Sequence, residues 1–218
     1  MLSPLQQRIA RLVERTTEGD DFALAGGGAL VSRGDVDRLT QDLDFFGLAP
    51  ESVDRVSPLV QETLTRAGLE VGIVREVHGF VRLSVSDGDE RTEIDLAADA
   101  RLFAPEQGPL VRTLAAEELA VDKVLAIFGR AEARDFIDLQ ALEPRYGLAR
   151  LLALAAEKDR GFRPEVFQEM LGRFQRLARQ EFQLDSRGYV ALAATVEEWR
   201  ARTLDIGRDV GPDTGIGL

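Results

Sequence analysis

The 218-residue sequence contains no cysteine, a single histidine and only two lysines. Without cysteine the chain cannot form a disulfide, a thiolate zinc site or a cysteine nucleophile. One histidine, His78, disfavours a Ser-His-Asp triad and excludes a multi-histidine metal site. These absences remove several common classes of catalytic site.

Net positive charge and long apolar runs are also missing. The 27 basic residues are outnumbered by 38 acidic ones, giving a formal charge of −11. No global positive field is available to attract nucleic acid, so any RNA contact requires a local basic patch. No apolar run approaches the ~20 residues of a membrane span, and no basic segment precedes an apolar one at the N-terminus. We therefore expect a cytoplasmic protein that does not enter a membrane.

The hydrophobic pattern predicts an α+β fold. Short apolar or alternating segments indicate strands at about 22–25, 43–46, 69–77, 80–85 and 91–96, and Asp87-Gly88 is typical of a hairpin turn. Ser3-Pro4 predicts the start of a first helix and Ser57-Pro58 the start of another. This first lobe, residues 1–105, is expected to hold a mixed or antiparallel sheet.

Beyond about residue 109 no strand is predicted. Helical patterns follow at about 114–129, 133–142, 147–158, 164–184 and 188–203. We therefore predict an all-helical lobe over 110–205. The last residues, 206–218, are rich in glycine and are predicted to form a flexible tail.

Two aspartates in the second predicted strand are the most informative residues. Asp42 and Asp44 are separated by two positions, so a strand directs both side chains to one side, with Leu43 and Phe45 on the other. Two neighbouring carboxylates raise each other's pKa unless a positive charge lies between them. Mg²⁺ or Mn²⁺ would supply that charge, because hard cations prefer oxygen ligands. In the competing interpretation, Asp42 is a solvated turn residue at the start of the strand and Asp44 is a cap or pairs with an arginine.

A glycine run precedes this pair by about fifteen residues. Gly26, Gly27 and Gly28 follow a predicted strand and precede a helix. Glycines allow backbone N–H groups to approach a triphosphate, and the helix N-terminus adds a favourable dipole. A phosphate site followed by paired carboxylates is an arrangement suited to nucleotidyl transfer.

A third carboxylate is expected from another strand. In residues 91–96, Glu93 and Asp95 share one face, whereas Ile94 and Leu96 take the other. We predict Asp95 as the third metal ligand and keep Glu93 as the alternative. The competing interpretation is the polar outer face of an edge strand.

Taken together, four short motifs resemble one known family. They are GGGAL at 26–30, RLTQDLDFF at 38–46, KVLA at 123–126 and RDFIDL at 134–139. In this order they resemble the AbiEii-type nucleotidyltransferase toxins, which include MenT-like toxins and belong to the polymerase-β-like nucleotidyltransferase superfamily. The resemblance covers roughly half of the chain and implies a polymerase-β-like first lobe.

The resemblance also implies residue roles. Asp42 and Asp44 match the metal-binding pair, Lys123 the essential lysine, and Asp138 (or Asp135) the acidic residue of the last motif. Gly26 and Gly27 match the glycines that touch the nucleotide phosphates. The other predicted nucleotide-binding residues are Gly28, Arg38, Thr40, Lys123 and Arg130. Gly28 departs from the pattern, because many relatives carry serine or threonine there. Thr40 matches a hydroxyl position that can be phosphorylated to silence MenT-like members.

The helical-lobe motif is also interpretable from spacing alone. Lys123 and Arg130 are seven residues apart and would share one face of a helix, where two cations could neutralise a triphosphate. Asp135 and Asp138 lie together on the next predicted helix, where one of them could orient Lys123 by a charge-assisted hydrogen bond. Asp135 alone could equally be a helix-start residue favoured by the macrodipole.

The predicted activity is attack of an RNA 3′-hydroxyl on the α-phosphorus of a nucleoside triphosphate. The resemblance implies tRNA acceptor ends as target, CTP or UTP as donor, a block of translation as the outcome, and a cognate antitoxin as partner. A phosphate on Thr40 would place about two negative charges beside the carboxylates. Arg173, Arg176 and Arg179 would form one helical stripe able to contact RNA. The alternatives are transfer to a small molecule or protein hydroxyl, and a non-catalytic binding protein.

Overall fold

The computed structural model describes residues 1–209, which form two compact units that divide between Leu119 and Ala120. The N-terminal unit comprises α1 (Pro4–Thr16), β1 (Ala23–Ala25), α2 (Gly26–Arg33), β2 (Asp42–Gly47), α3 (Pro50–Arg66), β3 (Glu70–Val77), β4 (Phe80–Asp87), β5 (Glu90–Ala98), β6 (Glu106–Gln107) and β7 (Arg112–Thr113). The predicted tail over 206–218 is wrong for residues 206–209, which continue the last helix, and from residue 210 onward it lies outside the described residues.

A mixed sheet forms the centre of the N-terminal unit, with strand order β3-β4-β5-β2-β1-β7-β6. β2 is parallel to β5 and antiparallel to β1, which places it inside the sheet. The α+β prediction for this lobe is confirmed. β6 and β7, which were not predicted, are two residues each, too short to show a period.

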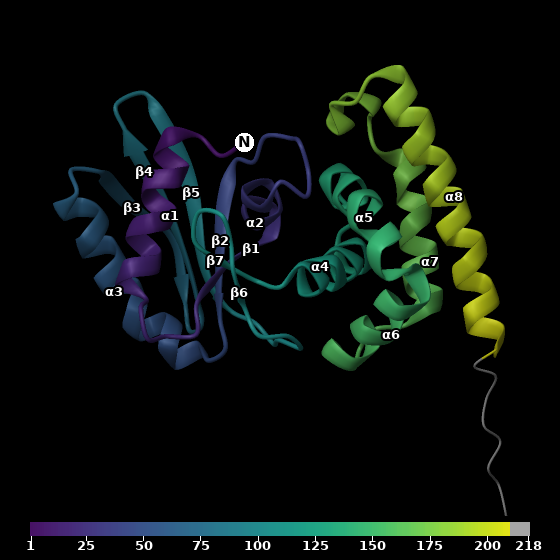
Figure 1. The fold of residues 1–218 in the computed structure, drawn as a ribbon, viewed down its shortest axis with the longest axis horizontal. Coiled ribbons are helices and arrows are strands. Elements are labelled where there is room, and N and C mark those ends of the chain that lie inside the picture. The colour runs from purple at the N-terminus through teal and green to yellow at the C-terminus, as the bar shows by residue number, and fades with distance from the viewer. Residues whose placement is uncertain (210–218) are drawn as a thin grey trace, which may run out of the picture. The chain divides into compact units, whose positions relative to one another are not determined.

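Helices α1 and α3 pack against each other and against strands of the sheet (Figure 1). As predicted, Ser3 caps α1, and its hydroxyl accepts a hydrogen bond from the Gln6 backbone N–H. The predicted start of a helix at Ser57-Pro58 is wrong, because α3 begins at Pro50 and contains Pro58 in its interior. Buried Val53, Val56, Val60 and Leu64 along α3 provide the packing that carries the helix through Pro58.

Buried polar contacts hold the chain just before β2. The Gln6 side-chain amide donates to the Thr40 carbonyl at 3.0 Å and to Thr92 Oγ1 at 3.3 Å. The Thr92 hydroxyl donates to the Gln41 carbonyl at 2.8 Å. Helix α1 and strand β5 thereby determine where β2 begins.

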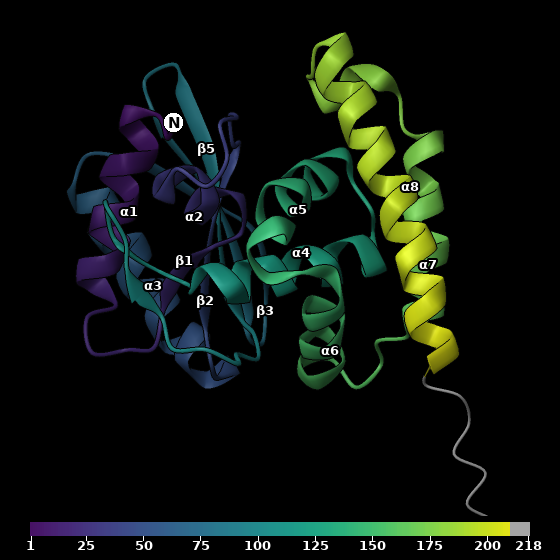
Figure 2. The same cartoon turned by 45° about the vertical axis from the view of Figure 1, so that its right-hand side comes forward.

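Helix α4 (Ala116–Gly129) crosses the division between the units, and the helices α5 (Ala133–Tyr146), α6 (Leu148–Lys158), α7 (Pro164–Leu171) and α8 (Ser186–Asp209) follow it. Within residues 120–209 no strand is present, as predicted. Helices α7 and α8 lie side by side (Figure 2). The units divide later than the predicted boundary near 105–110. Buried Glu118 explains this, because its carboxylate accepts the backbone N–H groups of Leu102 and Phe103.

The predicted single helix over 164–184 is wrong. Helix α7 ends at Leu171, and two 3₁₀ segments, η1 (Gly172–Arg176) and η2 (Arg179–Phe182), follow. Buried Phe174 and Phe182 pack against each other, with ring centroids 4.8 Å apart, and both rings pack on Tyr189. This aromatic packing draws the chain out of the helical path. Among the described residues, no helix is both long and apolar enough to cross a membrane.

Candidate functional site

The predicted carboxylate pair lies on one face of β2. Along this strand burial alternates, so Leu43 and Phe45 are fully buried whereas Asp42 and Asp44 are half-buried. The alternation agrees with the two-residue period of a strand. Asp42 and Asp44 therefore project from the sheet on the side opposite the buried core.

Gly26, the first residue of α2, lies directly against Asp44. It has a left-handed backbone with a φ of +55°, and a Cβ atom added to it would stand 2.0 Å from Asp44 Oδ2. Any side chain at this position would have to displace the carboxylate. The absence of a side chain at Gly26 thus makes room for the Asp44 carboxylate itself, next to a helix N-terminus whose backbone N–H groups favour negative charge.

Gly27 and Gly28 lie against different neighbours. A Cβ on Gly27 would stand 2.6 Å from Arg38 Nη2 and 3.1 Å from Thr40 Oγ1, so both side chains are next to the glycine run. A Cβ on Gly28 would stand 3.1 Å from buried Leu43 Cδ2. A serine or threonine at this position would therefore require Leu43 to shift, which is a local reason for the glycine.

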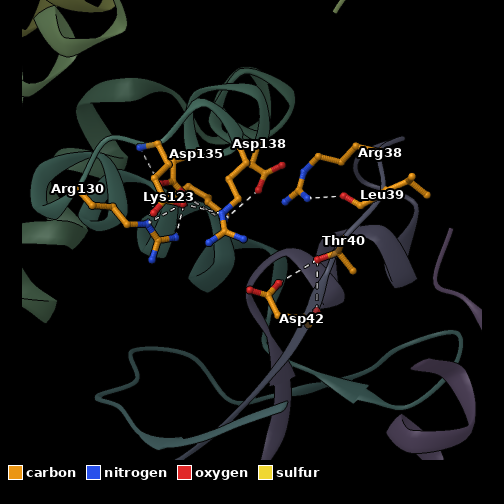
Figure 3. Close-up of polar contacts among 10 residues, drawn as sticks. Arg38, Leu39, Thr40, Asp42, Lys123, Arg130, Asp135 and Asp138 are labelled. Carbon is orange, nitrogen blue, oxygen red and sulfur yellow. Dashed lines mark hydrogen bonds and ion pairs between the residues drawn. The ribbon is translucent and has the colours of Figure 1, made fainter. Parts of the chain in front are cut away.

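Thr40 connects the glycine run to the carboxylate pair. Its hydroxyl donates to Asp42 Oδ1 at 3.2 Å, and the Asp42 carbonyl oxygen lies at 3.3 Å (Figure 3). Arg38 donates to the Leu39 carbonyl at 2.9 Å. In the N-terminal unit the structure therefore brings together the predicted residues Gly26, Gly27, Arg38, Thr40, Asp42 and Asp44.

Asp95 stands opposite Asp44 in the sheet, but its carboxylate is hydrogen-bonded to Arg82. In the β2–β5 register it faces Asp44, and Glu93 faces Asp42. Both oxygens of Asp95 accept hydrogen bonds from Arg82 on β4, at 2.7 and 2.6 Å. Within residues 1–209, no group of three acidic or histidine side chains is arranged to hold a metal ion. The predicted cluster of three carboxylates is therefore not formed, because Arg82 holds the third.

The sequence interpretation missed Arg82. The hairpin turn lies at Gly88-Asp89, one residue later than predicted, so Asp87 pairs with Glu90 and Arg82 stands opposite Asp95. Counting back from a two-residue turn at Asp87-Gly88 would instead have placed Arg82 opposite Glu93. The Asp95 hydrogen bonds, outweighing desolvation, raise the pKa of Arg82 above its ordinary value. This guanidinium is therefore charged at any physiological pH.

In the C-terminal unit, Lys123 is the centre of a buried charge cluster. Its side chain is 6% exposed, and Nζ lies 2.9 Å from Asp138 Oδ2 and 3.3 Å from Asp135 Oδ1 (Figure 3). Arg130 donates to both oxygens of Asp135, at 3.0 and 3.1 Å. The predicted charge-assisted contact to Lys123 is therefore made by both aspartates.

The charge of Asp135 is maintained by its cationic neighbours. Burial alone raises the pKa of this carboxyl. The charge of Lys123 and the hydrogen bonds from Arg130 act in the opposite direction and prevail, so the pKa of Asp135 lies below its ordinary value. Lys123, Arg130 and the ionised Asp135 are thus mutually stabilising.

The second lysine, Lys158, is also buried and pairs with Asp122. Both lysines of this arginine-rich chain are thus buried ammonium groups paired with aspartates of the C-terminal unit. Burial of an ion pair does not by itself show a catalytic role. Lys123 belongs to a different unit from Asp42 and Asp44, and their joint action on one triphosphate stays a prediction.

The three arginines predicted to contact RNA are all exposed but do not share a helix. Arg173 and Arg176 lie in η1, and Arg179 lies in η2. The predicted helical stripe is therefore wrong. Arg173 donates to the Arg130 carbonyl at 3.2 Å, and Arg179 donates to Ser186 Oγ at 2.7 Å and lies over the Tyr189 ring.

A family model and two solved structures resemble this chain. The model described as "Nucleotidyl transferase AbiEii toxin, Type IV TA system" matches residues 9–213. A search of curated proteins finds no match. The nucleotidyltransferase toxin MenT4 from Mycobacterium tuberculosis is 22% identical, with a TM-score of 0.60, covering 92% of this chain and 82% of that chain. JHP933 from Helicobacter pylori is 16% identical, with a TM-score of 0.57, covering 96% and 98%. At these identities the solved structures show a common fold.

Replacing Lys123 with methionine is expected to destabilise the chain strongly. The change leaves Asp135 and Asp138 buried without their shared cation, which costs about 3–5 kcal/mol of unfolding free energy. Urea unfolding followed by circular dichroism measures the loss. Arg130→Met is the matched control, because it removes a more exposed partner of the same Asp135 and should cost about 1 kcal/mol. Equal losses for the two variants would contradict the buried cluster.

The lowered pKa of Asp135 predicts an acid-sensitive contribution to stability. The contribution is fully present above the unfolded-state pKa of about 3.9 and is lost as pH falls through the lower folded-state value. The difference in unfolding free energy between the wild-type chain and Asp135→Asn should therefore shrink on acidification from about pH 6 to about pH 3. Urea titrations of both proteins across that range measure it. A difference that stays constant with pH would contradict the assignment.

Proposed function

The chain belongs to the AbiEii family of nucleotidyltransferase toxins, and from this premise we propose that it transfers nucleotides from CTP or UTP to the 3′ acceptor end of tRNA and thereby blocks translation. The observation that carries the proposal is the pair Asp42 and Asp44 on one face of β2, beside the glycine start of α2. These are the two groups that nucleotidyl transfer requires, a metal ligand pair and a phosphate-binding backbone.

The donor set fits a divalent cation such as Mg²⁺ or Mn²⁺. Asp42 and Asp44 offer carboxylate oxygens, and the missing side chain of Gly26 lets the Asp44 carboxylate lie against the start of α2. Mg²⁺ is usually held by one or two carboxylates together with substrate phosphates. When bound, the cation would supply Lewis-acid stabilisation to the entering and leaving oxygens of the reaction.

The glycine run would bind the donor nucleotide. In the proposed reaction the RNA 3′-oxygen forms a bond to the α-phosphorus, the bond to the β-phosphate oxygen breaks, and pyrophosphate leaves. Backbone N–H groups at the start of α2 would bind phosphate oxygens, and Arg38 and Thr40 lie beside Gly27 at the same place. The three glycines allow the phosphates to approach the backbone closely.

Lys123 and Arg130 are the proposed cations of the C-terminal unit, as the family motif implies. Asp138 and Asp135 hold the ammonium of Lys123 in one orientation. A lysine fixed in this way would offset the charge that develops on departing pyrophosphate without first having to be ordered. Asp138 would thus act through Lys123.

An RNA acceptor requires positively charged contacts on the surface of the chain. Exposed Arg173, Arg176 and Arg179 are proposed RNA contacts, which a chain of net charge −11 needs if it binds an anionic polymer. Transfer to a small molecule or to a protein hydroxyl would use the same carboxylate pair. A non-catalytic binding protein would not require the pair at all.

Thr40 offers a route for control by the antitoxin. Its hydroxyl contacts Asp42, so a phosphate there would add about two negative charges next to the proposed metal ligand. We propose that an antitoxin inactivates the chain by phosphorylating Thr40. The added charge would compete with the nucleotide phosphates for the same space.

Asp42→Asn and Asp44→Asn are each expected to lower nucleotide transfer by at least about 100-fold, since each change removes one of two ligand carboxylates, while the fold persists. The measurement is incorporation from each labelled triphosphate into total RNA, protein and small molecules. Asp89→Asn, in the exposed β4–β5 turn, is the matched control and should retain activity. Label in protein or small molecules would favour the alternative acceptors, and no label in any fraction would favour the binding protein.

Co-expression with the antitoxin should place a phosphate on Thr40 and abolish transfer. Intact-mass and peptide mass spectrometry locate the modification. Thr40→Val removes the acceptor hydroxyl and should prevent the modification. An inactive protein that carries unmodified Thr40 after co-expression would contradict this route.

A further inference from the structure

Three strands place charged residues in one row across the sheet. Asp44 on β2 faces Asp95 on β5, and Asp95 faces Arg82 on β4. The strands β4, β5 and β2 are neighbours in the sheet (Figure 1). Residues directly opposite one another on adjacent strands share a face. A carboxylate in the middle of this row can therefore turn either toward Asp44 or toward Arg82.

The two carboxylates of the row turn to different neighbours. Asp44 lies against Gly26, as the 2.0 Å distance from its Oδ2 to an added Cβ shows. Asp95 is engaged at both oxygens by Nε and Nη2 of Arg82, and its side chain is 10% exposed. Bidentate pairs of this kind combine two charge-assisted hydrogen bonds with a fixed orientation.

Arg82 also attracts Glu93, a second acidic residue of β5. Its Nη1 lies 3.5 Å from Glu93 Oε2. Glu93 and Asp95 stand opposite the two aspartates of β2 in the strand register. Both have the Arg82 guanidinium as a partner. The Arg82–Asp95 pair carries no net charge, so a cation near β2 experiences chiefly the two aspartates of that strand.

We propose that Arg82 is a positioning residue that limits the metal-binding set to Asp42 and Asp44 by holding Asp95 away from it. This inference rests on the proposed function, in which those two aspartates bind a divalent cation. Two carboxylates leave coordination positions for substrate phosphates. A third would bind the bare cation more tightly and add a negative charge that repels the triphosphate. Arg82 therefore favours binding of cation and nucleotide together.

Mn²⁺ titration of the full chain without nucleotide tests the proposal, with free Mn²⁺ followed by electron paramagnetic resonance. Arg82→Met should tighten Mn²⁺ binding about ten-fold or more, because Asp95 is released toward the site. Arg75→Met is the matched control. It removes an arginine on β3 that lies over the same Phe80 ring as Arg82, and it should change the affinity by less than about three-fold.

The double variant Arg82→Met with Asp95→Asn is decisive. It removes the pair without changing the net charge, so Mn²⁺ affinity should return to within about three-fold of wild type, because both ligands remain. An affinity at least about ten-fold weaker than wild type would show that Asp95 is a ligand and would overturn the proposal. An Arg82→Met affinity no tighter than that of Arg75→Met would also overturn it.

Two further variants distinguish a failure of this inference from a failure of the protein to fold and from a failure of the proposed function. Arg82→Gln with Asp95→Asn retains a hydrogen-bonding amide pair, and it serves in place of the double variant if thermal unfolding shows that the latter does not fold. Asp42→Asn should weaken Mn²⁺ binding about ten-fold or more. Unchanged binding in Asp42→Asn would refute the metal pair of the proposed function itself, and this inference with it.

Discussion

The two-residue period of β2 is the constraint on which the N-terminal site depends. Leu43 and Phe45 are buried in the core, so the pleat directs Asp42 and Asp44 to the opposite face. A register slip of one residue would bury two carboxylates and expose two large apolar side chains. The cost of that exchange holds the strand in place. The contacts of Gln6 and Thr92 with the preceding backbone fix its start.

Carboxylates serve two different purposes in the two units. On β2 they are half-buried, and Gly26 makes room for the Asp44 carboxylate. Around Lys123 they are fully buried and matched by cations, so the cluster is satisfied internally. Changes at the two places therefore have different consequences: loss of the half-buried β2 aspartates leaves the core intact, whereas loss of Lys123 leaves buried charges unpaired.

Local signals accounted for much of the fold. The alternation in β2 and the Ser3 cap depend on neighbouring residues and were predicted correctly, and the β4–β5 hairpin was predicted with its turn one residue too early. The errors came from tertiary packing. α3 continues through Pro58 because its valines and leucine are buried, and the aromatic contacts of Phe174 and Phe182 break the helix expected over 164–184.

The sequence by itself determined the family, the α+β class, and the carboxylate pair beside a glycine run, because each rests on residue identity and short spacing. Only the tertiary structure decided that Asp95 pairs with Arg82. It also decided that Lys123 forms ion pairs with two buried aspartates and that Gly26 lies against Asp44. These contacts join residues that are twelve or more positions apart. Which of several possible partners a charged side chain takes depends on strand register and helix packing, which short sequence patterns do not specify.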